Sequence, residues 1–442
     1  MSPIDLKSAF GLAACVPLLA CSPVIRAADA RRPVNELSFG PESTIGNGAA
    51  NPATPFLRYA PDGRLFAVWT EDHDRVPAEE KHHAAHPRIA GKMAPSPMRD
   101  LYVASSSDGG KTWATPKQVN SEIEAVQGEE NGPKLALSKA SRAYVVWSIP
   151  SARGDKTRAN IRSAMEDDRS GFTTAQTLNE VKDAARFPTI EATPRGDFLV
   201  AWIDRRFDNP EPRRLYLVRL GADGRPSTAN YAVGDALCEC CKLAIAMAGD
   251  GRAVYIVNRQ VDRHTVRNHV LRKSMNGGAS FGPPVEISDD GWQVPSCPHS
   301  GPSIGLDSRG WLHVAWFTLG RTEKEAGVYY SVSKDGGKSF APRRLVHANT
   351  VPEILYVDLT VGDNDRVYLA WTNVDGNGKA QVYMRTISAD GRSWSPISQI
   401  SNARGNASRP TLATNKDRLH IAWTETDGER SRAVLRSAEV EQ

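Results

Sequence analysis

Residues 300–346 read SGPSIGLDSRGWLHVAWFTLGRTEKEAGVYYSVSKDGGKSFAPRRLV, and this stretch decides the fold. Four runs follow one another in it: SGPSIGLDSRG opens the stretch, and WLHVAWF, GVYYSVS and PRRLV come after. Short apolar runs that are rich in β-branched and aromatic residues, and that end at Gly, Pro or Asp, are typical of β-strands. The stretch therefore predicts a four-stranded antiparallel meander.

The turn between the third and fourth runs, SKDGGKSF, has a pattern that recurs along the chain. Asp335 can accept hydrogen bonds from its own turn, and the two glycines after it adopt positive φ at little cost. The pattern Ser-x-Asp-x-Gly-x-Ser/Thr-Trp/Phe returns at 106–113, at 274–281 with Asn in place of Asp, and in shortened form at 388–394. Four copies in phase with a longer repeat indicate a repeated folding unit.

This turn resembles the Asp box of sialidases and related β-propellers. The resemblance implies an all-β chain that folds as a β-propeller of four-stranded antiparallel blades, with the Asp-box turns on one face. It covers nearly all of the chain after the N-terminal segment. An Asp box is a folding element, so it carries no prediction about catalysis.

The number of blades is predicted from a core position that returns in the second strand of each unit. The spacing is roughly 55 residues after the first interval, which is typical of propeller blades. We expect the aromatic residues at this position to pack between blades. Seven positions predict seven blades, whereas sialidase catalytic domains have six, so a six-bladed ring is the alternative. The positions are Trp69, Trp147, Trp202, Val257, Trp316, Trp371 and Trp423.

The last unit, from Arg409 to the C-terminus, holds only three strand-like runs. The missing run is at the other end of the chain, because residues 38–45, SFGPESTI, are similar to residues 280–287, SFGPPVEI, which enter a fourth strand. We therefore expect the N-terminal strand to complete the C-terminal blade and close the ring, which removes an open sheet edge. Residues 34–442 are predicted to form a single propeller domain.

Residues 1–28 have the features of an export signal, with Lys7 as the n-region charge and a short apolar run after it. Leu18-Leu-Ala-Cys21 resembles a bacterial lipoprotein signal with acylation at Cys21, and cleavage after Ala28 is the alternative. Both predict an exported protein, in the periplasm or as an outer-membrane lipoprotein held only by that lipid. The net charge of +4 is spread without a basic cluster, so we expect no nucleic-acid partner, and we expect a monomer.

Functional residues of a propeller are expected where first strands begin and after second strands, because these loops share one face. Arg186 and Arg409 precede first strands, and Arg206 follows a second strand. The guanidinium fork binds carboxylate and sulfate groups in a bidentate manner. These arginines therefore predict a site for a small acidic ligand or an acidic glycan, and ion pairs within the loops are the alternative.

Cysteines gather before the first strands of the fourth and fifth units. Cys238, Cys240 and Cys241 precede one strand, and Cys297 and His299 precede the next. In an oxidising compartment four such cysteines predict two disulfides, or one disulfide and a free pair. Thiolate and imidazole ligands also suit copper or zinc, so a metal site is the second interpretation.

The long loop at 71–99 is rich in histidine and methionine and lies on the same predicted face. His82 and His86 are four residues apart and would share one side of a helical turn. Such loops bind soft or borderline metals, and a solvated loop without a ligand is the alternative. The loop thus extends the metal hypothesis.

Tyr356 opens the sixth unit in a Tyr-x-x-Leu setting that resembles the nucleophilic tyrosine of sialidases. The resemblance implies Tyr356 as nucleophile, with Glu353 or a glutamate of the second unit as its base, because a neutral nucleophile avoids repulsion from a substrate carboxylate. An interior packing tyrosine is the alternative. The sialidase signature Phe/Tyr-Arg-Ile-Pro is absent, and PFLRYAPDG stands in its place at 55–63.

Three functions are consistent with these patterns. The first is a sialidase-like propeller that binds or hydrolyses glycans bearing an acidic group, and the sequence does not decide whether it is an enzyme. The second is a periplasmic copper- or zinc-binding propeller that uses the Cys/His cluster. The third is a non-catalytic interaction platform.

Overall fold

The computed structural model describes residues 34–46, 51–72, 99–120, 124, 126–128, 131–151, 158–207, 213–235, 237–238, 241–262, 265–293, 300–348, 356–428 and 430–441. Within these ranges the regular structure consists of thirty β-strands and one turn of 3-10 helix, η3 (Glu323–Glu325). None of the described residues forms a helix long and apolar enough to cross a membrane.

The strands form seven antiparallel sheets, which we number as blades in chain order. Blade one holds β2 (Ala53–Tyr59), β3 (Leu65–Asp72), β4 (Arg99–Ser106) and β5 (Lys117–Gln118). Blade two holds β6 (Lys134–Leu137), β7 (Ala143–Pro150), β8 (Ala159–Asp167) and β10 (Gln176–Thr177), with β9 (Gly171–Phe172) also paired to β8. Blade three holds β11 (Ala185–Ala192), β12 (Phe198–Asp204), β13 (Arg214–Leu220) and β14 (Tyr231–Gly234).

Blade four holds β15 (Ala244–Met247), β16 (Val254–Val261), β17 (Val266–Ser274) and β18 (Val285–Glu286), with β19 (Trp292–Gln293) also paired to β17. Blade five holds β20 (Ser303–Leu306), β21 (Leu312–Thr318), β22 (Gly327–Ser333) and β23 (Arg344–Ala348). Blade six holds β24 (Val357–Val361), β25 (Val367–Val374), β26 (Ala380–Ile387) and β27 (Ser398–Gln399). Blade seven holds β28 (Asn406–Asn415), β29 (Arg418–Asp427), β30 (Arg430–Glu439) and β1 (Ser43–Ile45).

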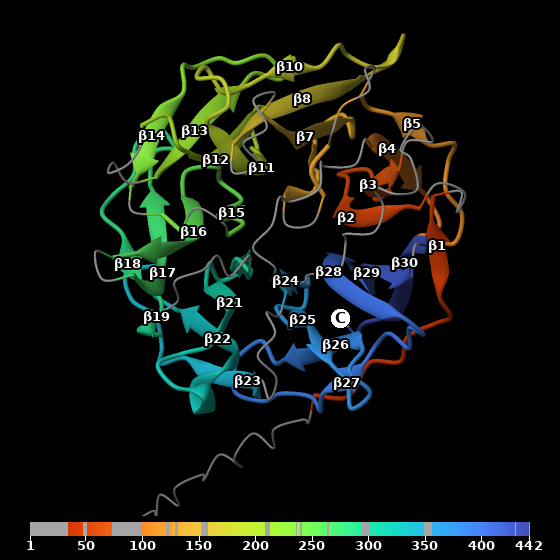
Figure 1. Ribbon diagram of the computed structural model, residues 1–442, viewed down its shortest axis with the longest axis vertical. Helices are drawn as coiled ribbons and strands as arrows, with labels where there is room; N and C mark the ends of the chain where they lie inside the picture. The colour runs from red at the N-terminus through yellow and green to blue at the C-terminus, as the bar shows by residue number, and fades with distance from the viewer. Residues whose placement is uncertain are drawn as a thin grey trace, which may run out of the picture. The chain divides into compact units, whose positions relative to one another are not determined.

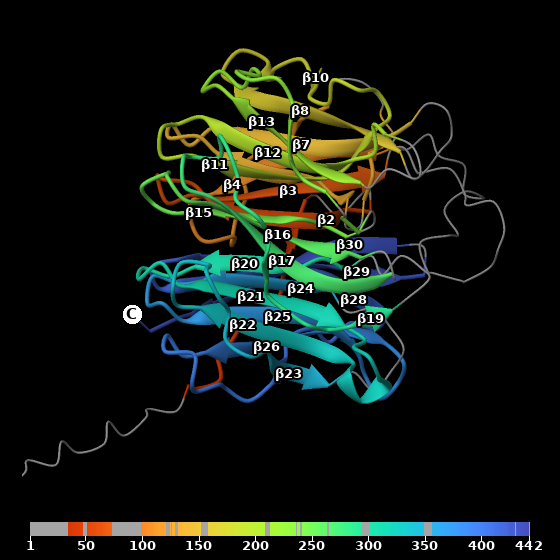
Figure 2. The ribbon, with the colours of Figure 1, turned by 90° about the vertical axis from the view of Figure 1, so that its left-hand side faces the viewer.

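The blades form a ring with their first strands innermost (Figure 1), so the protein is a seven-bladed β-propeller. In Figure 2 the strands of each blade run from one face of the ring to the other. Because successive strands are antiparallel, the start of every inner strand lies on the face to which the second strand returns. The predicted seven blades are confirmed, and the six-bladed alternative is wrong.

The N-terminal strand closes the ring, as the sequence predicted. β1 pairs with β30, with Ser43 opposite Leu435 and Ile45 opposite Ala433. Ile45 is fully buried in the core that blades seven and one share. In Figure 1 the red N-terminal strand lies beside the blue strands of the C-terminal blade. Strands from the two ends of the chain therefore share one blade, and β1 completes its four-stranded sheet.

A tryptophan recurs at one position in the second strands and is fully buried in each case. In five blades its indole Nε1 donates a hydrogen bond to a carboxylate, at 2.7 to 3.3 Å. This pairing meets the need of a buried indole N–H for a partner. The five pairs are Trp69–Glu71, Trp147–Glu124, Trp202–Asp204, Trp316–Asp290 and Trp423–Glu425.

Blade four departs from this series, and the position assigned to Val257 is wrong. Asn258, not Val257, stands fifth in β16, as Trp69 does in β3. Val257 packs in the same apolar cluster as Trp316 of blade five. Asn258 is buried, and neither atom of its carboxamide has a hydrogen-bond partner. The sequence pattern favoured the apolar neighbour, but the alternation of side chains along the strand places the polar residue in the tryptophan position.

The turns between third and fourth strands contain the hydrogen bonds expected of their sequence. The Asp335 carboxylate accepts bonds from the backbone N–H groups of Lys338 and Ser339, both at 3.0 Å, and from the hydroxyl of Ser333 at 2.8 Å. A further bond from the Ser339 hydroxyl, 2.6 Å long, is the main reason that the pKa of Asp335 lies well below its ordinary value. Gly336 and Gly337 both have positive φ. Asp108 makes the same contacts in blade one.

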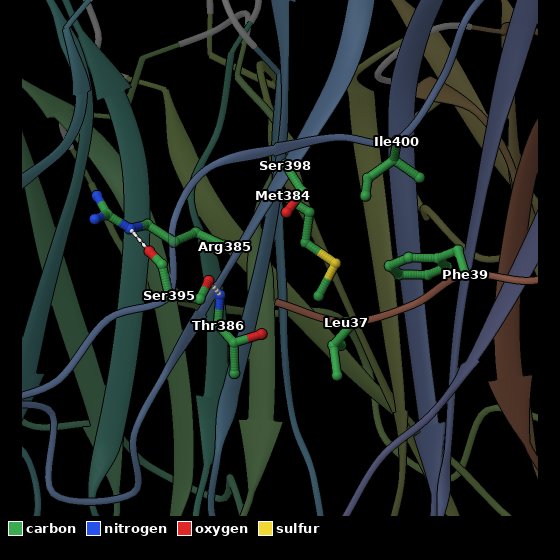
Figure 3. Close-up of a pocket in the computed structure, with 8 residues that line it drawn as sticks. All are labelled: Leu37, Phe39, Met384, Arg385, Thr386, Ser395, Ser398 and Ile400. Atoms are coloured by element: carbon green, nitrogen blue, oxygen red, sulfur yellow. Dashed lines mark hydrogen bonds between the residues drawn. The ribbon is translucent and has the colours of Figure 1, made fainter. Parts of the chain in front are cut away.

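A small cavity lies between blade six and the residues that precede β1 (Figure 3). Its volume is about 10 Å³, which is barely room for one water molecule. Beside it the Arg385 Nε donates to the Ser395 carbonyl oxygen at 2.6 Å. The cavity is too small for a ligand, and its walls are Leu37, Phe39, Met384, Arg385, Thr386, Ser395, Ser398 and Ile400.

Candidate functional site near the propeller axis

The seven inner strands begin on one face, and in five of them a proline stands at the entry. Where no proline occurs, Leu243 and Val357 take its place, because Ala244 pairs with Val257 as Ser303 pairs with Ala315 in blade five, and Val357 pairs with Trp371. The residue that follows starts the inner strand or lies within it. These residues are Phe56, Lys134, Thr189, Ala244, Ser303, Asp358 and Thr411.

The residue before the proline has an uncommon backbone conformation in three blades. Thr54, Phe187 and Arg409 have φ of 51°, 55° and 56°, and each lies at an irregularity in the pairing of its inner strand. Positive φ in a non-glycine residue is costly and tends to persist at functional sites. The Arg409 N–H donates to the Thr372 hydroxyl of blade six at 3.2 Å, which helps to hold this conformation.

Arg409 and Tyr356 meet at the entries of blades seven and six. The Arg409 Nη2 lies 3.3 Å from the Tyr356 hydroxyl oxygen, to which it donates. The guanidinium carbon also lies 4.7 Å from the centre of the tyrosine ring. This contact brings together two residues that the sequence predicted for the site, 53 positions apart.

Contacts between blades four, five, six and seven extend this pair. The Lys242 Nζ of blade four donates to the Val357 carbonyl oxygen of blade six at 2.8 Å, passing the intervening blade. The Asp358 carboxylate accepts a bond from the Ser303 hydroxyl at 2.9 Å and one from the Leu412 N–H at 2.9 Å. We call Tyr356, Arg409, Lys242, Asp358 and Ser303 the axial site. The sequence analysis missed the last three. The proline register would have located Ser303 and Asp358, whereas Lys242 lies two residues before the equivalent position, Ala244.

Blades one, two and three add positive charge on their inner strands. The Lys134 Nζ lies 5.0 Å from the centre of the Phe56 ring, and the Arg58 guanidinium carbon lies 4.3 Å from it. Arg186 at the start of β11 lies 4.7 Å from the ring centre of Phe187. Cations at these entries attract an anionic ligand, and aromatic faces suit contact with a sugar or another planar group.

Arg206 has a different environment from the other two predicted arginines. Its Nε and Nη2 bind the two carboxylate oxygens of Asp204 at 2.9 and 3.0 Å. Its guanidinium carbon also lies 3.7 Å from the ring centre of Tyr216. An acidic ligand would have to compete with Asp204 for the guanidinium group. For Arg206 the structure therefore favours the alternative interpretation, an ion pair within the protein.

The predicted metal ligands are only in part among the described residues. Cys238 and Cys241 are buried, and their Sγ atoms lie 3.6 Å apart. The other predicted ligands lie outside the described residues: Cys240, Cys297, His299, His82 and His86. The predicted base Glu353 also lies outside them. Among the described residues, no three His, Cys, Asp or Glu side chains are grouped to hold a metal ion.

Glu191 on the inner strand of blade three has a perturbed acidity. Removal from solvent raises the pKa of its carboxyl group to about 7, and the charge of Arg58 opposes this rise. The unfolded chain loses this proton near pH 4.5, whereas the folded protein retains it until about pH 7. The contribution of Glu191 to stability therefore falls as pH rises through this window.

We expect the substitution Glu191→Gln to remove this pH dependence. The variant should melt at a higher temperature than the natural protein above the window, with a much smaller difference below it. Thermal unfolding of both proteins across the pH range measures this. An unchanged difference in melting temperature at every pH would show that Glu191 ionises normally in the folded protein.

The fold is similar to that of several solved structures. A protein of unknown function from Dyadobacter fermentans DSM 18053 shares 15% identity with a TM-score of 0.53, over 93% of this chain and 99% of that one. The polysaccharide lyase Uly1 shares 10% identity with a TM-score of 0.53, over 94% of each chain. The Hadza microbial sialidase Hz136 shares 12% identity with a TM-score of 0.47, over 88% of this chain and 66% of that one. Scans against family models and curated proteins found no match. At these identities the likeness shows the fold alone.

Proposed function

We propose that this protein binds a glycan bearing an acidic group at the axial site and acts on it there. The observation that carries the proposal is the pairing of Arg409 with Tyr356, with Lys242 extending toward the same entry. An arginine fork and an ammonium group supply the charge-assisted hydrogen bonds that a carboxylate or sulfate needs. The tyrosine ring supplies an apolar surface and a hydroxyl group for the sugar.

Three further points support the substrate class. One solved structure of similar fold is titled a polysaccharide lyase. The turns with the Ser-x-Asp-x-Gly pattern resemble those of sialidases. Export directed by residues 1–28, with or without a lipid on Cys21, would place the protein outside the cytoplasm, where it could encounter acidic glycans.

Titration calorimetry with sialylated and hexuronate oligosaccharides at low ionic strength tests the proposal. We expect at least one acidic class to bind, and the affinity to fall as salt is added, because the attraction is partly electrostatic. Neutral oligosaccharides of the same length serve as controls. Equal binding of acidic and neutral sugars would contradict a site built for an acidic group.

Processing, as distinct from binding, is predicted to depend on the Tyr356 hydroxyl. Tyr356→Phe removes only that oxygen, and we expect product formation from the bound glycan to fall by at least 100-fold, in the range seen when a positioned nucleophile or acid–base group is lost. Binding should change little. Product release from labelled oligosaccharides, followed with the affinity of the variant, separates the two. A Tyr356→Phe variant that is fully active would exclude this residue from the chemistry.

A further inference from the structure

Arg259 is a fully buried arginine near the end of β16, the second strand of blade four. Its Nη2 donates to the carbonyl oxygens of Ser300 and Phe317 in blade five, both at 2.8 Å. Its own carbonyl oxygen accepts a bond from the backbone N–H of Cys238 at 2.9 Å. A guanidinium is costly to bury unless it is hydrogen-bonded. These bonds therefore use one buried residue to hold the main chain at the entries of blades four and five.

Gly301 follows Ser300 and is the place where these two entries touch. A Cβ atom at this position would lie 2.2 Å from the Lys242 carbonyl oxygen, 2.4 Å from its Cγ and 2.8 Å from its backbone nitrogen. Two of these three atoms belong to the main chain, so rotation of a side chain would not relieve the collision. Gly301 does not have positive φ. Glycine is therefore needed here for space, because the backbone of Lys242 lies directly against it.

Lys242 is the member of the axial site that these contacts reach. It precedes β15, whose pairing with β16 begins at Ala244, so the ladder of blade four does not hold it. Its ammonium group is held at one end, by the bond from Nζ to the Val357 carbonyl oxygen at 2.8 Å. Its backbone is held at the other end, by the packing against Gly301. The placement of this cation therefore depends on residues of blade five.

We propose that Arg259 and Gly301 are positioning residues of the axial site, which act through Lys242. The Arg259 guanidinium holds the entry of blade five at Ser300, and the absence of a side chain at Gly301 lets the Lys242 backbone lie against that entry. Neither residue is a member of the axial site, so each affects a ligand only through the place of the ammonium group. The effect on glycan affinity rests on the proposed function, whereas the placement of the Lys242 segment does not.

Hydrogen exchange of the full chain without any ligand tests the placement of the segment. We expect Gly301→Ala to speed amide exchange around Lys242 at least several-fold and to leave exchange in the distant strand β30 unchanged. Arg259→Lys should act in the same direction, because an ammonium group retains the charge but lacks the planar fork of the guanidinium. Gly249→Ala is the matched control, since a Cβ atom there meets nothing within 4 Å. Natural exchange around Lys242 in both variants, or equal acceleration in β30, would overturn the proposal.

A double-mutant cycle with an acidic oligosaccharide tests whether the effect passes through Lys242. Gly301→Ala should weaken binding by about 10-fold, the loss typical of one charge-assisted hydrogen bond. In a Lys242→Gln background the same substitution should change the affinity by less than about twofold, because the group that it displaces is already gone. Full additivity of the two losses would refute the route through Lys242. Failure of every acidic glycan to bind the natural protein would count against the proposed function, and hydrogen exchange would then decide the positioning role.

Discussion

Arg409→Gln is expected to weaken the binding of an acidic glycan by roughly 10- to 100-fold, the loss typical of one charge-assisted hydrogen bond. Arg409 is the residue whose guanidinium contacts Tyr356, and glutamine removes its charge while retaining much of its length. Titration calorimetry of the variant with the best ligand of the natural protein measures the loss. Circular dichroism shows whether the fold is intact.

Arg404→Gln is the matched control for this variant. Arg404 precedes the same inner strand but is exposed, so its replacement makes the same change in net charge and leaves the contact between Arg409 and Tyr356 in place. We expect its affinity to stay within about twofold of the natural protein, as for surface charges that make no direct contact. Equal losses in the two variants would show that general charge, and not the position of Arg409, attracts the ligand.

Trp423→Ala is expected to lower the free energy of unfolding by about 3–5 kcal/mol, the usual cost of truncating a fully buried tryptophan. Trp423 is fully buried and packs in the core between blades six and seven. Its loss also removes the N–H donor, 3.1 Å away, from the Glu425 carboxylate. Because blade seven contains strands from both ends of the chain, destabilising this blade also weakens the closure of the ring.

Urea denaturation followed by fluorescence and circular dichroism measures this loss. Ile397→Ala is a suitable control, since this residue is 40% exposed and surface substitutions usually change stability by about 0.5 kcal/mol or less. A Trp423→Ala protein as stable as the control would mean that the recurring tryptophans do not hold the blades together.

The ring could be predicted from sequence because its core repeats with the blade. The tryptophan spacing indicated the number of blades, and the similarity of residues 38–45 to the start of a fourth strand identified the closing strand. Both patterns arise because the same packing is repeated in successive blades. Val257 was misassigned for the same reason: an apolar residue was expected where the structure has Asn258. A repeat pattern locates the core position but does not show where one blade breaks it.

The site could be predicted only in part. Tyr356 and Arg409 each have a local signal, so the sequence identified both, but their contact depends on the register of two blades. Lys242 was missed because its partner is a backbone carbonyl 115 residues away, which has no side-chain signal. Arg206 has a local partner in Asp204, two residues before it, which the sequence allowed as an alternative.

The most direct test of an acid-binding axial site is a comparison of one oligosaccharide with its carboxyl-reduced form. The two ligands differ only in a carboxylate that has become a primary alcohol, so their difference in affinity isolates the acidic group. We predict that reduction weakens binding to the natural protein by at least 10-fold, since a charge-assisted bond to arginine is lost, and has little further effect in Arg409→Gln. Equal affinity of the natural protein for both ligands would contradict the proposal that this propeller recognises an acidic glycan.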